Sequence, residues 1–92
     1  MNTLTFTWDE KKNMSNQEKH GVSFEEAKTV FFDEHAIEYP DPDHFEDEDR
    51  FLMVGRSYRF RMLIVCHCFR NEDSEIRIIS ARKLTKKELE TL

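Results

Sequence analysis

Arg50, His67 and Arg77 are the side chains whose types and spacing best suit chemistry in this sequence. Guanidinium groups pair with phosphate oxygens and stabilise the charge that builds up in a phosphoryl transition state. A histidine can move a proton near neutral pH. RNA supplies its own nucleophile, the 2′-hydroxyl, so the set predicts metal-independent cleavage of a phosphodiester. The alternative is that both arginines pair with acidic neighbours and the histidine is a hydrogen-bonded surface residue.

Three stretches with the alternating apolar pattern of strands are expected to bring these side chains together. The strands are expected at about 50–57, 61–69 and 75–83, joined by a tight turn at 58–59 and a polar loop at 70–74. With those turns Arg50 faces His67 and His67 faces Arg77, which gives one row on an open sheet face. A one-residue slip in the register would move the row to the other face.

The opposite side of the middle strand is apolar and is expected to lie beneath the helices. Its side chains are Met62, Ile64, Cys66 and Cys68. Both cysteines are therefore predicted to be core residues and not metal ligands. Two cysteines make no disulfide framework, which favours a reducing, cytoplasmic location.

No metal site and no cofactor are predicted. The loop that carries His35, Asp43 and His44 has no fixed ligand spacing. The sequence has no Gly-rich phosphate loop, and no apolar run approaches the roughly 20 residues that a membrane-spanning helix needs.

The remaining elements complete a single domain over residues 1–92. A half-buried strand with Leu4, Phe6 and Trp8 comes first, followed by a helix at 10–20 that Asp9 caps and Gly21 ends. Further elements are a helix at about 24–32 opened by a capping box at Ser23, a short strand at 36–39 and a terminal helix opened by a second capping box at Thr85. The order β-α-α-β-β-β-β-α predicts an α+β fold, a mostly antiparallel sheet with helices packed on one face.

The charge is unevenly distributed along the chain. The net charge is −5, but residues 1–49 carry 4 basic and 14 acidic side chains, whereas residues 50–92 carry 10 basic and 5 acidic ones. The overall charge predicts poor non-specific binding to nucleic acid. A local positive patch in the second half can still focus an anionic ligand.

Several blocks of the sequence resemble the BrnT-type toxins of bacterial type II toxin–antitoxin pairs. The resemblance rests on Phe6-x-Trp8-Asp9 with Lys12, on Lys19 to Ala27, on Val30-Phe31 with Asp33, on Arg50-Phe51-Leu52, on Gly55-Arg56-Ser57, and on Ile76 to Lys83 with Thr85 and Glu88. It covers nearly the whole chain in order. Lys19 to Ala27 and Ile76 to Lys83 are its most specific blocks.

The resemblance implies a RelE-like ribonuclease fold and a toxin that cuts RNA and inhibits translation. It also implies a BrnA-like ribbon-helix-helix antitoxin, through which the pair would bind operator DNA. Arg50, Arg77 and His67 are the expected catalytic residues. The expected RNA-binding residues are Arg56, Arg61, Arg82 and Lys83.

A different class of function stays open on the sequence alone. The acidic first half suits a binding module that acts mainly as antitoxin partner and corepressor, with weak or absent catalysis. Growth arrest on expression, relieved by the antitoxin, would separate the nuclease from the module.

Overall fold

The computed structural model describes residues 4–43 and 49–92, and their elements follow the predicted order. The elements are β1 (Thr5–Thr7), α1 (Glu10–His20), α2 (Phe24–Thr29), the 3-10 helix η1 (Val30–Phe32), β2 (Ile37–Pro40), β3 (Arg50–Arg56), β4 (Met62–Arg70), β5 (Glu75–Lys83) and α3 (Lys86–Glu90). Within the described residues, no helix has the length and apolar character needed to span a membrane.

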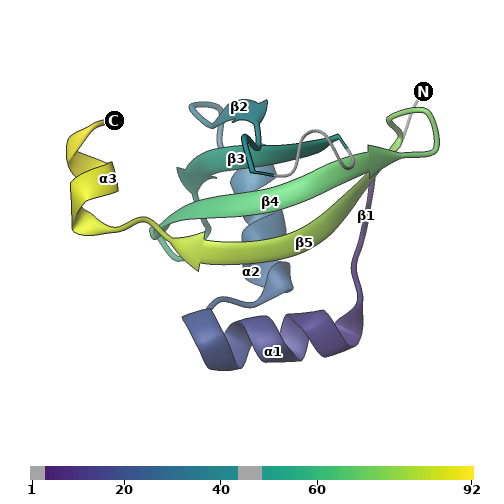
Figure 1. The fold of residues 1–92 in the computed structure, drawn as a ribbon, viewed down its shortest axis with the longest axis horizontal. Helices are drawn as coiled ribbons and strands as arrows, with labels where there is room; N and C mark the ends of the chain where they lie inside the picture. The colour runs from purple at the N-terminus through teal and green to yellow at the C-terminus, as the bar shows by residue number, and fades with distance from the viewer. Residues whose placement is uncertain (1–3, 44–48) are drawn as a thin grey trace.

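The strands form one sheet in the order β1-β5-β4-β3-β2. β1 runs parallel to β5, and every other neighbouring pair is antiparallel. Figure 1 shows α2 behind the sheet and α1 below it, along the β5 side, while α3 projects beyond the end of β5. The α+β fold with a mostly antiparallel sheet is confirmed, and the side of the sheet away from α2 is its open face (Figure 1).

Local signals in the sequence explain where α1 begins and ends. Asp9 accepts the Lys11 amide at 2.8 Å and caps the helix, and Gly21 takes the left-handed conformation that ends it (φ 70). Buried amides attach this mostly polar helix to the sheet in place of an apolar face. The Asn16 side chain donates to the carbonyls of Val22 (2.8 Å) and Ala81 (2.7 Å) and accepts the Ala81 amide (3.1 Å).

The main core lies between the sheet and α2 with its flanking residues. α2 and its flanks contribute Val22, Phe24, Ala27 and Val30, while the sheet contributes Leu63, Val65, Ile76, Ile78 and Ala81. The expectation that Met62, Ile64, Cys66 and Cys68 lie beneath the helices is therefore wrong. Ile64 and Met62 instead belong to a second apolar cluster on the open face, with Leu52, Val54 and Leu84. Both cysteines are buried and free.

The faces are exchanged because the pairing differs by one residue from the expected register along β3–β4 and over residues 67–70 of β4 with β5. The β3–β4 connection takes the five residues 57–61, with Phe60 in the left-handed region (φ 62), so Arg56 pairs with Met62 and not with Arg61. A bulge at Cys66/His67 then shifts the pairing of β4 with β5. Since side chains alternate between faces, a slip of one residue moves a whole row to the other side.

Candidate functional site

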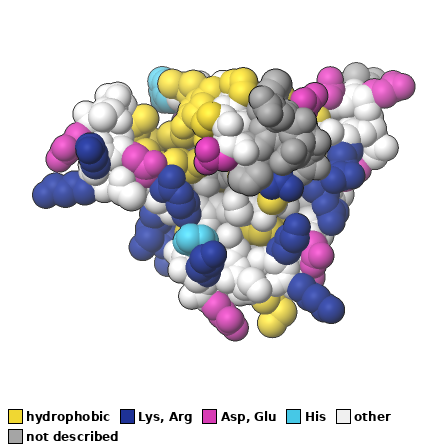
Figure 2. Space-filling model, in the orientation of Figure 1, with side chains coloured by type: hydrophobic (Ala, Val, Ile, Leu, Met, Phe, Trp, Pro, Cys, Tyr) yellow, Lys and Arg dark blue, Asp and Glu magenta, His cyan; other side chains and the backbone are white. Residues whose placement is uncertain are grey.

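Arg50 and Arg77 do form a row on the open face, but Cys68 stands between them where His67 was expected. Arg50 pairs with Cys68, Cys68 pairs with Arg77, and Arg77 pairs with Thr7 across four neighbouring strands. Figure 2 looks onto this face and shows Lys and Arg side chains across its middle and right side, with apolar surface gathered at the upper left. The sheet thus brings two guanidinium groups from strands far apart in the sequence onto one surface.

A pocket of about 240 Å³ collects four cations around this row, and we call it the basic pocket. Lys12, Arg50, Arg70 and Arg77 line it, together with Asp9. Among the described residues, neither Arg70 nor Arg77 has a carboxylate oxygen within 4.0 Å. Such a concave set of donors suits an anion with several oxygens, such as a phosphodiester.

A second pocket of about 230 Å³ adjoins the basic pocket, and Arg50 and Ile79 line both. It also contains His20, Asp41 and Arg82. His20 stands in the last turn of α1, which the Asn16 hydrogen bonds fix against β5. The open face therefore offers a histidine beside the arginines, although not the expected one.

His67 lies on the other side of the sheet and is completely buried (0% exposed). Its Nδ1 is 3.0 Å from the Val65 carbonyl and its Nε2 is 2.6 Å from the Glu38 carboxylate. Its ring packs edge-on against those of Phe31 and Phe69. Through these two contacts the ring fastens β2 to the core. The expected row of His67 with Arg50 and Arg77 is wrong, since the register slip turns this side chain under the helices.

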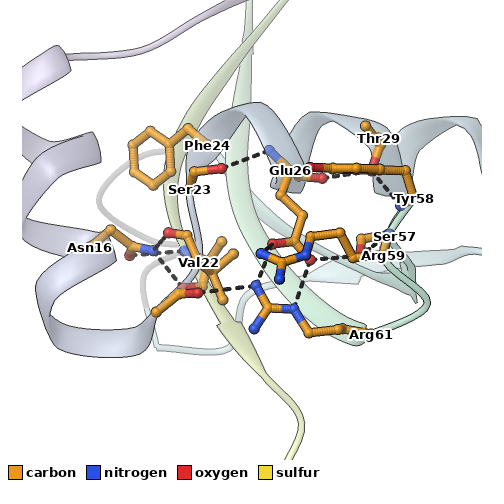
Figure 3. A network of polar contacts seen from close by, with 12 residues as sticks. Asn16, Val22, Ser23, Phe24, Glu26, Thr29, Ser57, Tyr58, Arg59 and Arg61 are labelled. Carbon is orange, nitrogen blue, oxygen red and sulfur yellow. Dashed lines mark hydrogen bonds and ion pairs between the residues drawn. The ribbon is translucent and has the colours of Figure 1, made fainter.

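Arg61 serves the fold, and Figure 3 shows why. Its guanidinium makes two hydrogen bonds to the Glu26 carboxylate, one of them from Nε at 2.9 Å, and a third to the Gly21 carbonyl. Ser57 donates to the same carboxylate at 2.7 Å. The capping box at Ser23 is therefore half formed. The Ser23 hydroxyl accepts a hydrogen bond from the Glu26 backbone amide, but the Glu26 side chain binds Arg61 instead of the Ser23 backbone.

The charge of Glu26 is stabilised in spite of its burial (2% exposed). Burial alone would raise the pKa of this carboxyl, but the hydrogen bonds from Arg61 and Ser57 outweigh it and lower the pKa. The Arg61 guanidinium is bound to Glu26 and Gly21 and is not available to a ligand. The prediction that Arg61 contacts RNA is therefore wrong.

The other expected RNA contacts lie apart from the basic pocket. Arg82 makes a two-pronged ion pair with Glu88 at 2.8 and 2.9 Å. Lys83 is exposed at the end of β5, and Arg56 is exposed with its guanidinium 5.9 Å from the Phe60 ring centre. The structure thus places Arg50 and Arg77 at the basic pocket, pairs Arg61 and Arg82 with described carboxylates, and leaves Arg56 and Lys83 away from the basic pocket.

Cys66 is close to the arginines but is not a nucleophile. Burial and the neighbouring Asp41 carboxylate, whose oxygen lies 3.7 Å from Sγ, raise the pKa of this thiol to about 11. The thiol therefore stays protonated at neutral pH. Within residues 4–43 and 49–92, no three His, Cys, Asp or Glu side chains are grouped to hold a metal ion. His44, one of the residues considered for a metal, lies outside the described residues.

Sequence reasoning missed Lys12, His20 and Arg70 as members of this surface. Arg70 follows from the corrected register, because it pairs with Glu75 two residues from the Cys68–Arg77 pair. Lys12 and His20 depend on the parallel pairing of β1 with β5 and on the Asn16 contacts. The only local signal was the position of His20 in the last turn of a well-capped helix.

Comparisons with known proteins agree with this fold. A family model described as "Ribonuclease toxin, BrnT, of type II toxin-antitoxin system" matches residues 8–88. The crystal structure of the ribonuclease toxin BrnT of Brucella abortus superposes with a TM-score of 0.72 at 22% sequence identity, over 91% of this chain and 100% of that one. No curated protein sequence matches the chain.

The structural match supports the fold, and the family match extends over most of the chain, so the resemblance seen in the sequence is confirmed. This chain belongs to the BrnT family, the ribonuclease toxins of type II toxin–antitoxin systems.

Proposed function

We propose that this chain is an endoribonuclease that holds the scissile phosphate of RNA in the basic pocket. The observation that carries the proposal is the convergence of Lys12, Arg50, Arg70 and Arg77 on one concave part of the open face. Arginines from separate strands can contact different phosphate oxygens at once, and they stabilise the added charge of the transition state.

The proposed reaction needs no metal. The RNA 2′-oxygen forms a bond to the adjacent phosphorus while the bond from phosphorus to the 5′-oxygen breaks. A base takes the 2′-hydroxyl proton and an acid gives a proton to the leaving oxygen, which leaves a 2′,3′-cyclic phosphate and a 5′-hydroxyl. His20 is the proposed proton-transfer group in place of the buried His67, because it lines the pocket that shares Arg50 with the basic pocket.

The proposed partner is a BrnA-like ribbon-helix-helix antitoxin that neutralises the toxin and carries it to operator DNA. The proposed cellular effect is inhibition of translation in the cytoplasm. Support comes from the family, whose members act in type II toxin–antitoxin systems. Exposed apolar side chains on β2 and in or after α3 offer a surface for a protein partner: Ile37, Tyr39, Leu89 and Leu92.

Cleavage of RNA by the purified protein in the presence of EDTA tests the proposal. We expect cleavage to persist with EDTA and to leave cyclic phosphate ends, which mass spectrometry of the products detects. Arg77→Ala should lower the rate about 100- to 1,000-fold, the usual effect of removing one transition-state donor. Lys83→Ala, an exposed cation outside the basic pocket, is the matched control. Strict dependence on Mg²⁺, or equal rates for the two variants, would refute the mechanism.

The catalytically weak binding module remains the second candidate, because the apolar surface beside β2 suits a protein partner whatever the activity. Expression of the chain alone in bacteria separates the two. If the wild-type chain arrests growth and Arg77→Ala does not, the result supports the nuclease. If growth is unimpaired with the wild-type chain, the result supports the binding module.

A further inference from the structure

Three exposed aromatic rings surround a shallow pocket that the proposed catalytic surface does not use. Phe32, Tyr58 and Phe60 line it, and they are 71%, 66% and 80% exposed. The pocket has a volume of about 750 Å³ and lies where the β3–β4 hairpin meets η1, with Arg56 and Asp33 on its wall. We call it the aromatic pocket. Clustered rings with this degree of exposure mark a binding surface, whereas a single exposed ring would not.

The hairpin that carries two of the rings is firmly held. The Phe60 amide donates to the Ser57 carbonyl at 2.9 Å, and the Tyr58 amide donates to the Thr29 hydroxyl at 3.0 Å. The Ser57 hydroxyl is in turn bound to Glu26, as Figure 3 shows. The rings are therefore presented by a preorganised frame, which lowers the entropic cost of binding.

Phe60 keeps a conformation that a phenylalanine rarely adopts. Its φ of 62 lies in the left-handed region, and glycine or asparagine would fit there with less strain. The ring is almost fully in solvent, so the packing of the core does not explain its presence. Strain retained for an exposed ring is typical of a functional position.

The wall of the aromatic pocket adds polar groups with fixed positions. The Arg56 guanidinium lies over the Phe60 ring, 5.9 Å from its centre. The Asp33 carboxylate accepts the backbone amides of Arg56 (2.8 Å) and His35 (3.0 Å), and these hydrogen bonds lower its pKa. The pocket thus combines flat apolar faces, a guanidinium and an ionised acceptor.

We propose that the aromatic pocket binds an unpaired base of the RNA substrate. The rings and Arg56 stack on the base, and the Asp33 carboxylate accepts a hydrogen bond from the amino group of the base. Unstacked bases bind in this way on aromatic rings and guanidinium planes, and a carboxylate accepts the amino group of cytosine. Flat rings with a guanidinium and a polar wall suit a base better than they suit an aliphatic peptide segment. The carboxylate favours cytosine, adenine or guanine over uracil, which has no amino group.

The inference rests on the proposed function and extends it to the choice of substrate. Arg56 ends the strand that Arg50 begins, and the strand separates them by about 20 Å. A few nucleotides of single-stranded RNA span that distance. The chain would then hold RNA at two points, a phosphate in the basic pocket and a base in the aromatic pocket, and duplex RNA would not fit because its bases are stacked and paired.

Binding of labelled 2′-O-methyl oligonucleotides, which cannot be cleaved through the 2′-oxygen, tests the aromatic pocket by fluorescence anisotropy. Phe60→Leu should weaken binding of an oligocytidylate about 5- to 100-fold, the usual effect of losing one stacked base. Phe60→Tyr keeps the ring and should bind as the wild type does. Met14→Ser, at another exposed apolar residue (60% exposed), is the control. The wild type should bind oligouridylate more weakly than oligocytidylate.

Cleavage kinetics separate this inference from the proposed function. Phe60→Leu should raise KM by a similar factor and leave kcat unchanged, whereas Arg77→Ala should lower kcat. A wild type that cuts no RNA but binds oligocytidylate through Phe60 would remove the proposed nuclease and keep the base site. If the wild type cuts RNA and Phe60→Leu has the same KM, the proposed base site is wrong and the proposed nuclease is retained.

Two further outcomes decide the role of the ring. Phe60→Gly should relieve the left-handed strain and raise the urea midpoint of unfolding while weakening RNA binding, and a lower midpoint would show that the ring serves the fold. If Phe60→Leu left oligonucleotide binding intact but weakened binding of the antitoxin, the aromatic pocket would be a protein-docking surface and the inference would be wrong.

Discussion

Arginines at two places in this molecule have opposite surroundings. Arg61 faces the buried carboxylate of Glu26 and Arg82 faces Glu88, and each pair makes two parallel hydrogen bonds. Arg70 and Arg77 line the basic pocket without a carboxylate oxygen within 4.0 Å among the described residues. The residue type is the same, so the neighbouring carboxylate decides whether an arginine stabilises the fold or faces a ligand.

The paired arginine at Glu26 should matter most for stability. Arg61→Ala leaves a buried carboxylate without its main partner and should lower the free energy of unfolding by about 3 kcal/mol. Arg77→Ala should change it by less than about 0.5 kcal/mol, because no buried polar group in the described part of the chain depends on Arg77. Urea denaturation measures both. The double variant E26Q/R61M should recover part of the loss, and equal effects of the two single variants would contradict the comparison.

Acid should weaken the paired carboxylates in a defined range of pH. The folded-state pKa of Glu26 is below its unfolded value of 4.5, and the hydrogen bonds from Arg82 and Thr85 lower the pKa of Glu88 to about 2. Such groups stabilise the fold above pH 4.5, and this contribution is lost as the pH falls from 4.5 towards 2. Urea midpoints measured across this range should fall, and they should fall less steeply for Glu88→Gln. A midpoint independent of pH would contradict the assignment.

Salt dependence should distinguish the two groups of arginines at the level of ligand binding. Arg70→Gln should reduce the slope of log affinity against log salt by about 0.7 if Arg70 contacts one phosphate of single-stranded RNA. The double variant R82Q/E88Q removes a neutral pair and should leave the slope unchanged. Anisotropy titrations with uncleavable RNA at several salt concentrations give both slopes. A larger change for R82Q/E88Q than for Arg70→Gln would reverse the proposed roles.

Much of the fold could be predicted because its signals are local. Asp9, Gly21 and Thr85 mark helix ends through groups on neighbouring backbone, and the structure places α1 and β5 at the predicted bounds. Alternation likewise indicated β1, β3, β4 and β5, whereas the short strand expected at 36–39 was recognised by the prolines that follow it. The capping box at Ser23 was the partial exception, because a distant arginine competes for the Glu26 side chain.

The candidate site was harder to predict because it depends on pairing between strands. Arg50 and Arg77 were expected on the open face and lie there, but His67 was expected beside them and is buried against Glu38. The conformation of Phe60 in the turn and the bulge at Cys66/His67 set the register, and neither leaves a clear trace in composition.

The sequence alone determined the order of elements, their caps, the alternation of faces and the kinship with BrnT toxins, because each depends on residues close in the chain or on matching blocks. Only the tertiary structure decided which face of β4 the helices cover, which arginines are neutralised and which histidine stands beside the basic pocket. A side-chain period of two fixes which residues share a face. It does not say which face is covered, because turns and bulges set the register one residue at a time.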